Sequence, residues 1–186
     1  MPFGSLWLPG VVSAVAVFLV SSIVHMVLRY HRADYKRLAD EDAVAGAVRK
    51  AAPSPGLYFI PYCSEMSQMK DPAMVKKFTE GPVAHLTVLR NGPPALGKNL
   101  AQWFLLSLLI SFVTAYVARH TLPPGASGLE VMRITGTLAF AAYGFGYLQD
   151  SIWKGIPWSN SLRGLLDAAL YALTTGLVFR WLWPGA

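Results

Sequence analysis

Sulfur-containing side chains recur at every third position of one short polar segment, at Cys63, Met66 and Met69. Thiolate and thioether sulfurs are soft ligands that suit Cu(I). The imidazole of His85, on a later predicted strand, would add a nitrogen ligand. The spacing therefore favours a site that binds copper or another redox metal as one interpretation. The alternative is a structural cap over a small folded unit, because methionine commonly fills irregular apolar space.

His25 and Met26 stand together at the end of the first apolar segment. Histidine and methionine are both axial ligands of haem iron, which makes His25 a haem candidate. A second histidine at the same depth is missing, because His31 and His85 belong to a polar loop and His120 to the opposite side. A hydrogen bond from His25 to a neighbouring helix is therefore the alternative.

Asp167 is the one acidic residue well inside an apolar segment. A charge at the bilayer centre costs about 2.5 to 3.5 kcal/mol, so Asp167 needs a partner. Arg163 lies one helical turn before it and Tyr171 one turn after it, so the three share a helix face. We expect an ion pair between Asp167 and Arg163 near the end of the helix, and a proton or cation pathway is the alternative.

Catalytic motifs are missing from the sequence, which contains no Gly-x-Ser-x-Gly elbow, no His-Glu-x-x-His helix and no phosphate-binding glycine loop. We therefore assign no catalytic residue and expect no cofactor. Enzymatic activity stays open, because membrane enzymes also assemble sites from scattered residues.

The elements that must position these residues are membrane helices, because 54% of the chain is apolar and only 14% is charged. Residues 1–28 and 99–118 are free of charged side chains and long enough to cross a bilayer. The first lacks a basic leader, so we expect a retained anchor. Residues 129–149 and 162–183 span the bilayer if their charged ends reach the interface. The prediction is an all-α integral membrane protein with four transmembrane helices and a small α/β cytoplasmic insertion between the first and second.

Basic residues are unevenly distributed, since residues 29–98 hold eleven of the sixteen lysines and arginines. Lys154 and Arg163 lie in the loop between the last two spans, whereas Arg119, Arg133 and Arg180 fall on the opposite side. Cytoplasmic loops carry the excess of basic residues. We therefore predict a multi-pass protein of the bacterial inner membrane, with the long loop in the cytoplasm and both termini outside.

The long loop begins with a basic juxtamembrane segment and linker, residues 29–56, which we expect to continue the first helix as far as residue 38. Each cation near an anionic leaflet is worth about 1 kcal/mol. Lipid headgroup contact is one function of these side chains, and ordinary topology anchoring is the alternative. The residues concerned are Arg29, Arg32, Lys36 and Arg37.

Residues 57–98 form a predicted strand-helix-strand unit. Residues 57–60 and 84–89 have strand character, and between them Asp71 and Pro72 mark the start of a helix that Gly81 ends. We expect two parallel strands joined by a helical crossover. A unit of this size needs a docking surface on the spans or on a partner.

The third span carries small side chains at helical spacing, which allow close backbone approach in a membrane. We expect packing within the protein, and an oligomer interface is the alternative. The residues are Gly136, Thr137, Ala141, Ala142 and Gly146.

The stretch from Met69 to Pro72, then Gly81-Pro82, Leu86 to Val88, Asn91 to Pro94 and Gly97-Lys98, resembles a pattern in small uncharacterised bacterial inner-membrane proteins. The resemblance covers most of the chain from the basic segment to the fourth span. It implies no activity, cofactor or active-site residue.

The sequence thus predicts a non-catalytic accessory or scaffold subunit of a membrane assembly. Its expected partners are the lipid bilayer and other membrane subunits or itself, and the basic residues lack a nucleic-acid motif. A small homo-oligomeric transporter or channel using Asp167 is the alternative, and copper or haem handling is a third.

Overall fold

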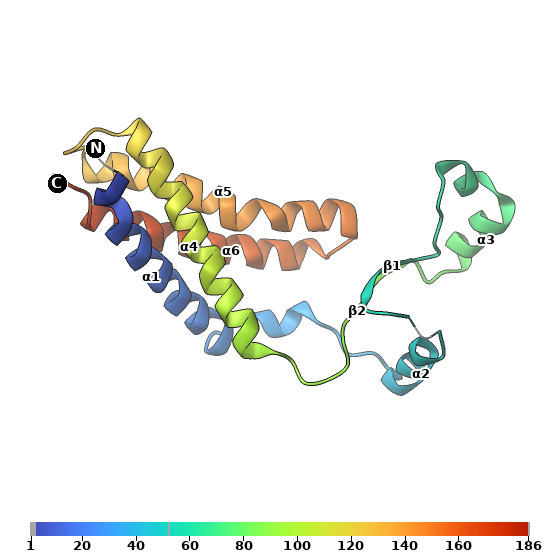
Figure 1. Ribbon diagram of the computed structural model, residues 1–186. Coiled ribbons are helices and arrows are strands. Elements are labelled where there is room, and N and C mark those ends of the chain that lie inside the picture. Colours follow the sequence, from blue (N-terminus) through green and yellow to red (C-terminus); the bar gives the residue numbers. More distant parts are fainter. Residues whose placement is uncertain (1–2, 52, 186) are drawn as a thin grey trace. The chain divides into compact units, whose positions relative to one another are not determined.

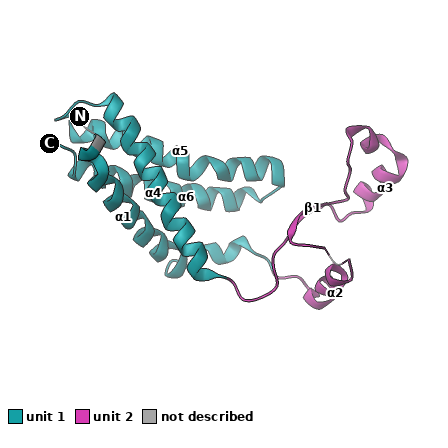
Figure 2. Cartoon of the chain, viewed as in Figure 1, with its two compact units in different colours: residues 1–36, 95–186 teal, residues 37–94 magenta. Residues whose placement is uncertain are grey.

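The computed structural model describes residues 3–51 and 53–185 (Figure 1). The chain divides into two compact units (Figure 2). The first unit comprises Met1–Lys36 and Ala95–Ala186, and the second comprises Arg37–Pro94.

The first unit is a helical bundle built from α1 (Trp7–Met26), α4 (Leu96–Thr121), α5 (Gly128–Lys154) and α6 (Trp158–Trp181). Two short 3-10 segments, η1 (Phe3–Leu6) and η2 (Tyr30–Asp34), flank α1. Helices α5 and α6 form an antiparallel pair joined by a short link, and α1 packs on both α4 and α6 (Figure 1).

Three of the described helices are long and apolar enough to cross a membrane: Gly4–Met26, Leu96–Thr121 and Trp158–Trp181. They correspond to the first, second and fourth predicted spans, so the membrane class is supported by length and composition. Helix α5 has 27 residues but does not join this group. Arg133 and Asp150 bound a short stretch in it that also contains glycine, tyrosine and glutamine.

Small residues permit the close packing of α5 against α6. A Cβ atom added at Gly144 would lie 3.1 Å from the Ala168 Cβ, and one added at Gly136 would lie 3.5 Å from the carbonyl oxygen of Ala172. The contact face of α5 differs in part from the predicted one. It contains the predicted Gly136 and Ala141, which are half-buried, and also Ala139 and Gly144, which are buried. Thr137, Ala142 and Gly146 are exposed on α5.

Helix α1 does not continue into the basic segment, so the predicted extension to residue 38 is wrong. The helix ends at Met26, and Arg29 adopts a left-handed conformation with φ 38°. The chain then turns into η2, which packs against α6. Tertiary contacts override local helix propensity here, because the polar side chains of η2 find buried partners on α6.

The second unit contains α2 (Glu41–Ala51), β1 (Gly56–Ile60), η3 (Met66–Lys70), α3 (Pro72–Glu80) and β2 (Ala84–Val88). The helix predicted after Asp71 is confirmed, since the Asp71 carboxylate accepts a 2.7 Å hydrogen bond from the backbone N–H of Ala73.

The strands β1 and β2 are antiparallel, so the predicted parallel crossover is wrong. Leu57 stands opposite Thr87, and Phe59 stands opposite His85. A parallel pair requires a crossover element that packs back onto the sheet. Helix α3 instead makes its main contacts with η3, and the segment between the strands acts as a long hairpin connection.

Candidate functional site

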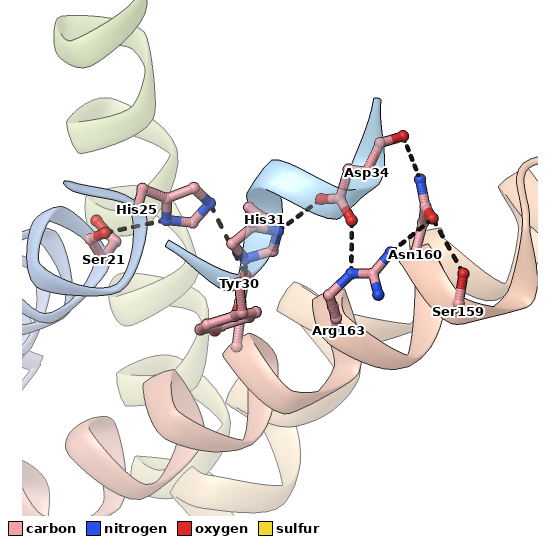
Figure 3. A network of polar contacts seen from close by, with 9 residues as sticks. Ser21, His25, Tyr30, His31, Asp34, Ser159, Asn160 and Arg163 are labelled. Carbon is pink, nitrogen blue, oxygen red and sulfur yellow. Dashed lines mark hydrogen bonds and ion pairs between the residues drawn. The ribbon is translucent and has the colours of Figure 1, made fainter. Parts of the chain in front are cut away.

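A cluster of polar side chains joins three segments of the first unit at the end of α1 (Figure 3). Helix α1 contributes His25, η2 contributes three residues, and the first half of α6 contributes three more. We call this set the polar cluster: His25, Tyr30, His31, Asp34, Asn160, Arg163 and Asp167.

Asp167 lies at the centre of the polar cluster and is fully buried. The Tyr30 hydroxyl donates a hydrogen bond to its Oδ1, and its Oδ2 lies 2.8 Å from the Nε2 atom of His31. The Nε2 atom of His25 lies 3.8 Å from the same oxygen. Three side chains from outside α6 thus surround this carboxylate, as the burial of a charge requires.

His31 lies between two carboxylates. Its Nδ1 atom is 2.6 Å from Oδ2 of Asp34, while its Nε2 atom faces Asp167. Arg163 neutralises Asp34, because its Nε atom donates a 2.6 Å hydrogen bond to Asp34 Oδ1. Burial by itself would raise the pKa of the Asp34 carboxyl, but the hydrogen bonds from His31 and Arg163, together with the positive charge of the Arg163 guanidinium, outweigh it and hold the pKa below its ordinary value.

Asn160 ties η2 to α6 at the edge of the polar cluster. Its amide donates a 3.0 Å hydrogen bond to the backbone carbonyl of Asp34, and its Oδ1 accepts one of 2.9 Å from Arg163 (Figure 3). Asp34 is therefore held through both its backbone and its side chain, which fixes the position of the neighbouring His31.

His25 occupies the last turn of α1, where its Nδ1 atom is 3.0 Å from the backbone carbonyl oxygen of Ser21. A carbonyl only accepts, so this contact places the proton on Nδ1 and leaves the lone pair on Nε2. The ring stacks on His31 with centroids 4.5 Å apart and planes 6° apart. The His25 side chain is 51% exposed, so the polar cluster is open on this side.

Tyr30 completes the surroundings of Asp167. Burial raises the pKa of the Tyr30 hydroxyl above its usual value, and the hydrogen bond to Asp167 raises it further. The hydroxyl therefore keeps its proton and serves as a permanent donor to this carboxylate.

One nitrogen from each histidine and one oxygen from Asp167 lie within 4.8 Å of one another. Imidazole nitrogens and carboxylate oxygens are common metal ligands, so these three residues are able to hold an ion. The same groups are also able to share a proton across His31.

The predicted contact between Arg163 and Asp167 is replaced by two separate ones, since Arg163 contacts Asp34 and Asp167 contacts Tyr30 and His31. Tyr171 is buried one turn beyond Asp167, but its hydroxyl has no hydrogen-bond partner among the described residues. Its ring instead lies 5.8 Å from that of Trp103 and 5.3 Å from that of Tyr143, centroid to centroid.

The predicted sulfur site belongs to the second unit. Cys63 donates from Sγ to the Glu65 carbonyl at 3.2 Å and to Gln68 Oε1 at 3.5 Å. Met66 is 81% exposed and Met69 is also exposed. The His85 ring packs at 4.8 Å from that of Phe59. Within residues 3–51 and 53–185, no hydrogen bond or ring contact joins the four predicted ligands to one another.

The predicted lipid contacts Arg29, Arg32, Lys36 and Arg37 are all exposed around η2. Their binding to headgroups stays a prediction.

Sequence reasoning missed Tyr30, His31 and Asp34 as partners of the polar residues of α1 and α6. A usable signal was present, because His31 and Asp34 are three apart and follow directly after His25 and the first span. The missing second histidine near His25 is His31, which the turn at Arg29 brings back onto it.

No protein-family model matches this chain, and no curated protein or solved structure is detectably similar to it.

Proposed function

We propose that this protein is a non-catalytic integral membrane protein that serves as an accessory or scaffold subunit of a membrane assembly. In this proposal, α5 completes a set of four spans in a bacterial inner membrane. The second unit lies on the cytoplasmic side and binds another subunit.

The observation that carries the proposal is the lack of a core in the second unit. Among its described residues, 37–51 and 53–94, none is buried. Large apolar side chains stay open instead, with Leu57 63%, Tyr62 74% and Leu89 75% exposed. Folding must offset about 1 to 2 kcal/mol of backbone entropy per residue, chiefly by burying apolar surface. A unit that buries so little therefore needs an external surface to stabilise it.

An apolar cavity offers a specific place for that contact. It has a volume of about 580 Å³ and is lined by Leu57, Tyr58, Phe59, Tyr62 and His85. Aromatic pockets of this kind accept the anchor side chains that dominate protein interfaces. We assign the cavity to an apolar side chain from another subunit of the assembly, because Leu57 and Tyr62 on its lining stay 63% and 74% exposed.

A photo-crosslinking amino acid at Tyr62, introduced into the full chain and irradiated in native membranes, tests the proposal. The expected result is an adduct of one defined larger mass that contains a second polypeptide. The matched control places the same group at Lys76, an exposed position on α3 of the same unit that does not line the cavity. An adduct with a second copy of this chain would instead favour the homo-oligomeric transporter or channel, and no adduct at Tyr62 would contradict both.

A further inference from the structure

We propose that His25, His31 and Asp167 bind one divalent transition-metal ion. The ligand atoms are His25 Nε2, His31 Nε2 and Asp167 Oδ2, which converge within 4.8 Å of one another. This site is separate from the partner contact of the second unit, because its residues all belong to the first unit.

The spacing of the ligand atoms suits a first-row metal. Metal bonds to imidazole nitrogen and carboxylate oxygen are about 2.0 to 2.2 Å long, so two ligand atoms on one ion stand about 3 to 3.5 Å apart. The distances from Asp167 Oδ2 to the two histidine nitrogens are 2.8 Å for His31 and 3.8 Å for His25, on either side of that range. Binding of one ion would bring His25 closer to Asp167 and would tilt its ring out of the 6° stack with His31.

Each ligand is held by a second contact through its other polar atom. The Ser21 carbonyl accepts from His25 Nδ1, the Asp34 carboxylate accepts from His31 Nδ1, and the Tyr30 hydroxyl donates to Asp167 Oδ1. Such contacts fix the tautomer and orientation of metal-binding histidines and are a regular feature of metal sites. Here they hold both Nε2 atoms and one carboxylate oxygen close to one another, and the two stacked rings would tilt toward each other at Nε2 for both lone pairs to reach one ion.

The charges in the polar cluster also call for a cation. Asp34 and Asp167 carry two negative charges, and Arg163 supplies one positive charge, which is directed at Asp34. With neutral histidines, the fully buried Asp167 carboxylate lacks a counter-charge of its own. Either a divalent ion or a proton on His31 Nε2 would supply this counter-charge. The experiment below distinguishes the two.

The ligand set indicates the class of ion. Two imidazole nitrogens and one carboxylate oxygen suit zinc, iron, manganese and neighbouring metals, whereas calcium and magnesium prefer oxygen ligands alone. Three protein ligands leave coordination positions open, and the half-exposed His25 gives ions a route from solution. The site lies where α1 ends, on the side from which the chain enters the second unit.

The test uses the full chain, extracted from its native membrane with an affinity tag that contains no histidine. Elemental analysis should find an equimolar amount of one transition metal. After removal of that metal, Co²⁺ should restore the site and give d–d absorption without the thiolate charge-transfer band that Cys63 would produce. His25→Gln, His31→Gln and Asp167→Asn should each abolish stoichiometric binding. Asp34→Asn should weaken it by about 10- to 100-fold, as expected for a group that orients a ligand.

Matched controls separate this site from the other candidates. His120→Gln removes an exposed histidine on α4 whose ring contacts the carbonyl oxygen and the ring of Tyr116 in the same helix, and it should leave binding unchanged. Cys63→Ser should also leave it unchanged. Should Asp167→Asn fail to fold, His25→Gln decides, because its ring is half-exposed.

Three results would overturn the proposal. One is wild-type protein that carries no transition metal and shows no Co²⁺ spectrum at saturation, which would leave a shared proton as the function of these contacts. Another is metal that survives all three ligand variants. The last is metal that disappears in Cys63→Ser.

Discussion

His31 Nε2 lies 2.8 Å from Asp167 Oδ2, although 136 positions separate the two residues in the sequence. This contact fastens η2 to α6 at the point where the chain leaves α1. It also determines the partner of the one buried acidic side chain of α6. The stability of the bundle and the composition of the polar cluster therefore depend on the same carboxylate.

Replacing Asp167 with leucine should destabilise the bundle strongly. The substitution leaves the Tyr30 hydroxyl and His31 without their buried acceptor, and loss of one partner of a buried ion pair costs about 3 to 5 kcal/mol. The measurement is unfolding of the purified protein in detergent with a chelator present, so that metal binding does not contribute. Asp150→Asn is the control, because its ion pair with Lys154 is exposed and worth about 0 to 1 kcal/mol. Equal losses in the two variants would contradict a central role for Asp167.

Acid should destabilise the protein partly through Asp34. Its folded pKa is held below the unfolded value of about 3.9, so its contribution to stability is complete above that value. The contribution is lost as the pH falls through the folded pKa, because protonation removes the hydrogen bonds from His31 and Arg163. We therefore expect the unfolding free energy of Asp34→Asn to fall less steeply than that of the wild type as the pH is lowered from 7.

The charged groups that face Asp34 are His31 from η2 and Arg163 from α6, with Asp167 beyond His31. The slope of unfolding free energy against pH is measured for both proteins. The difference between the wild-type slope and the Asp34→Asn slope gives the contribution of Asp34, because Asp167 is common to both proteins. An equal loss of unfolding free energy in acid for both proteins would show that Asp34 does not contribute to acid destabilisation.

The α5–α6 contact should be sensitive to bulk at Gly164. A Cβ atom there would lie 2.6 Å from a ring carbon of Tyr147, so either the ring or the helix must move. We expect Gly164→Ala to lower stability by about 1 to 3 kcal/mol, the usual cost of overpacking. Gly146→Ala is the control, since nothing lies within 4 Å of its added Cβ. That variant should be neutral or more stable by about 0.5 to 1 kcal/mol, because alanine favours a helix over glycine. The reverse order in a thermal unfolding series would contradict the packing of this helix pair.

The proposed topology has a natural probe in Cys63, the single cysteine of the chain. A maleimide that cannot cross membranes should leave Cys63 unmodified in intact spheroplasts and modify it in inside-out vesicles. A permeable maleimide serves as the control, because it should react in both preparations. Labelling in spheroplasts with the impermeant reagent would place the second unit outside and reverse the proposed orientation.

The amino-acid sequence by itself determined the features that depend on local composition. Three apolar helices appear where apolar stretches predicted the first, second and fourth spans, and α3 runs from Pro72 to Glu80 between its capping residues Asp71 and Gly81. These features follow from hydrophobicity and from the backbone hydrogen bonds of a few consecutive residues, so distant parts of the chain do not alter them.

The tertiary structure decided which polar groups meet. Helical spacing placed Arg163 near Asp167, but the turn at Arg29 returned His31 and Tyr30 to α6 and gave each carboxylate a different partner. The antiparallel pairing of β1 and β2 was likewise decided beyond the local pattern. Periodicity shows which residues of one helix or strand lie on the same face. The partner of a buried charge is instead chosen by whichever distant donors the packing brings within hydrogen-bond distance.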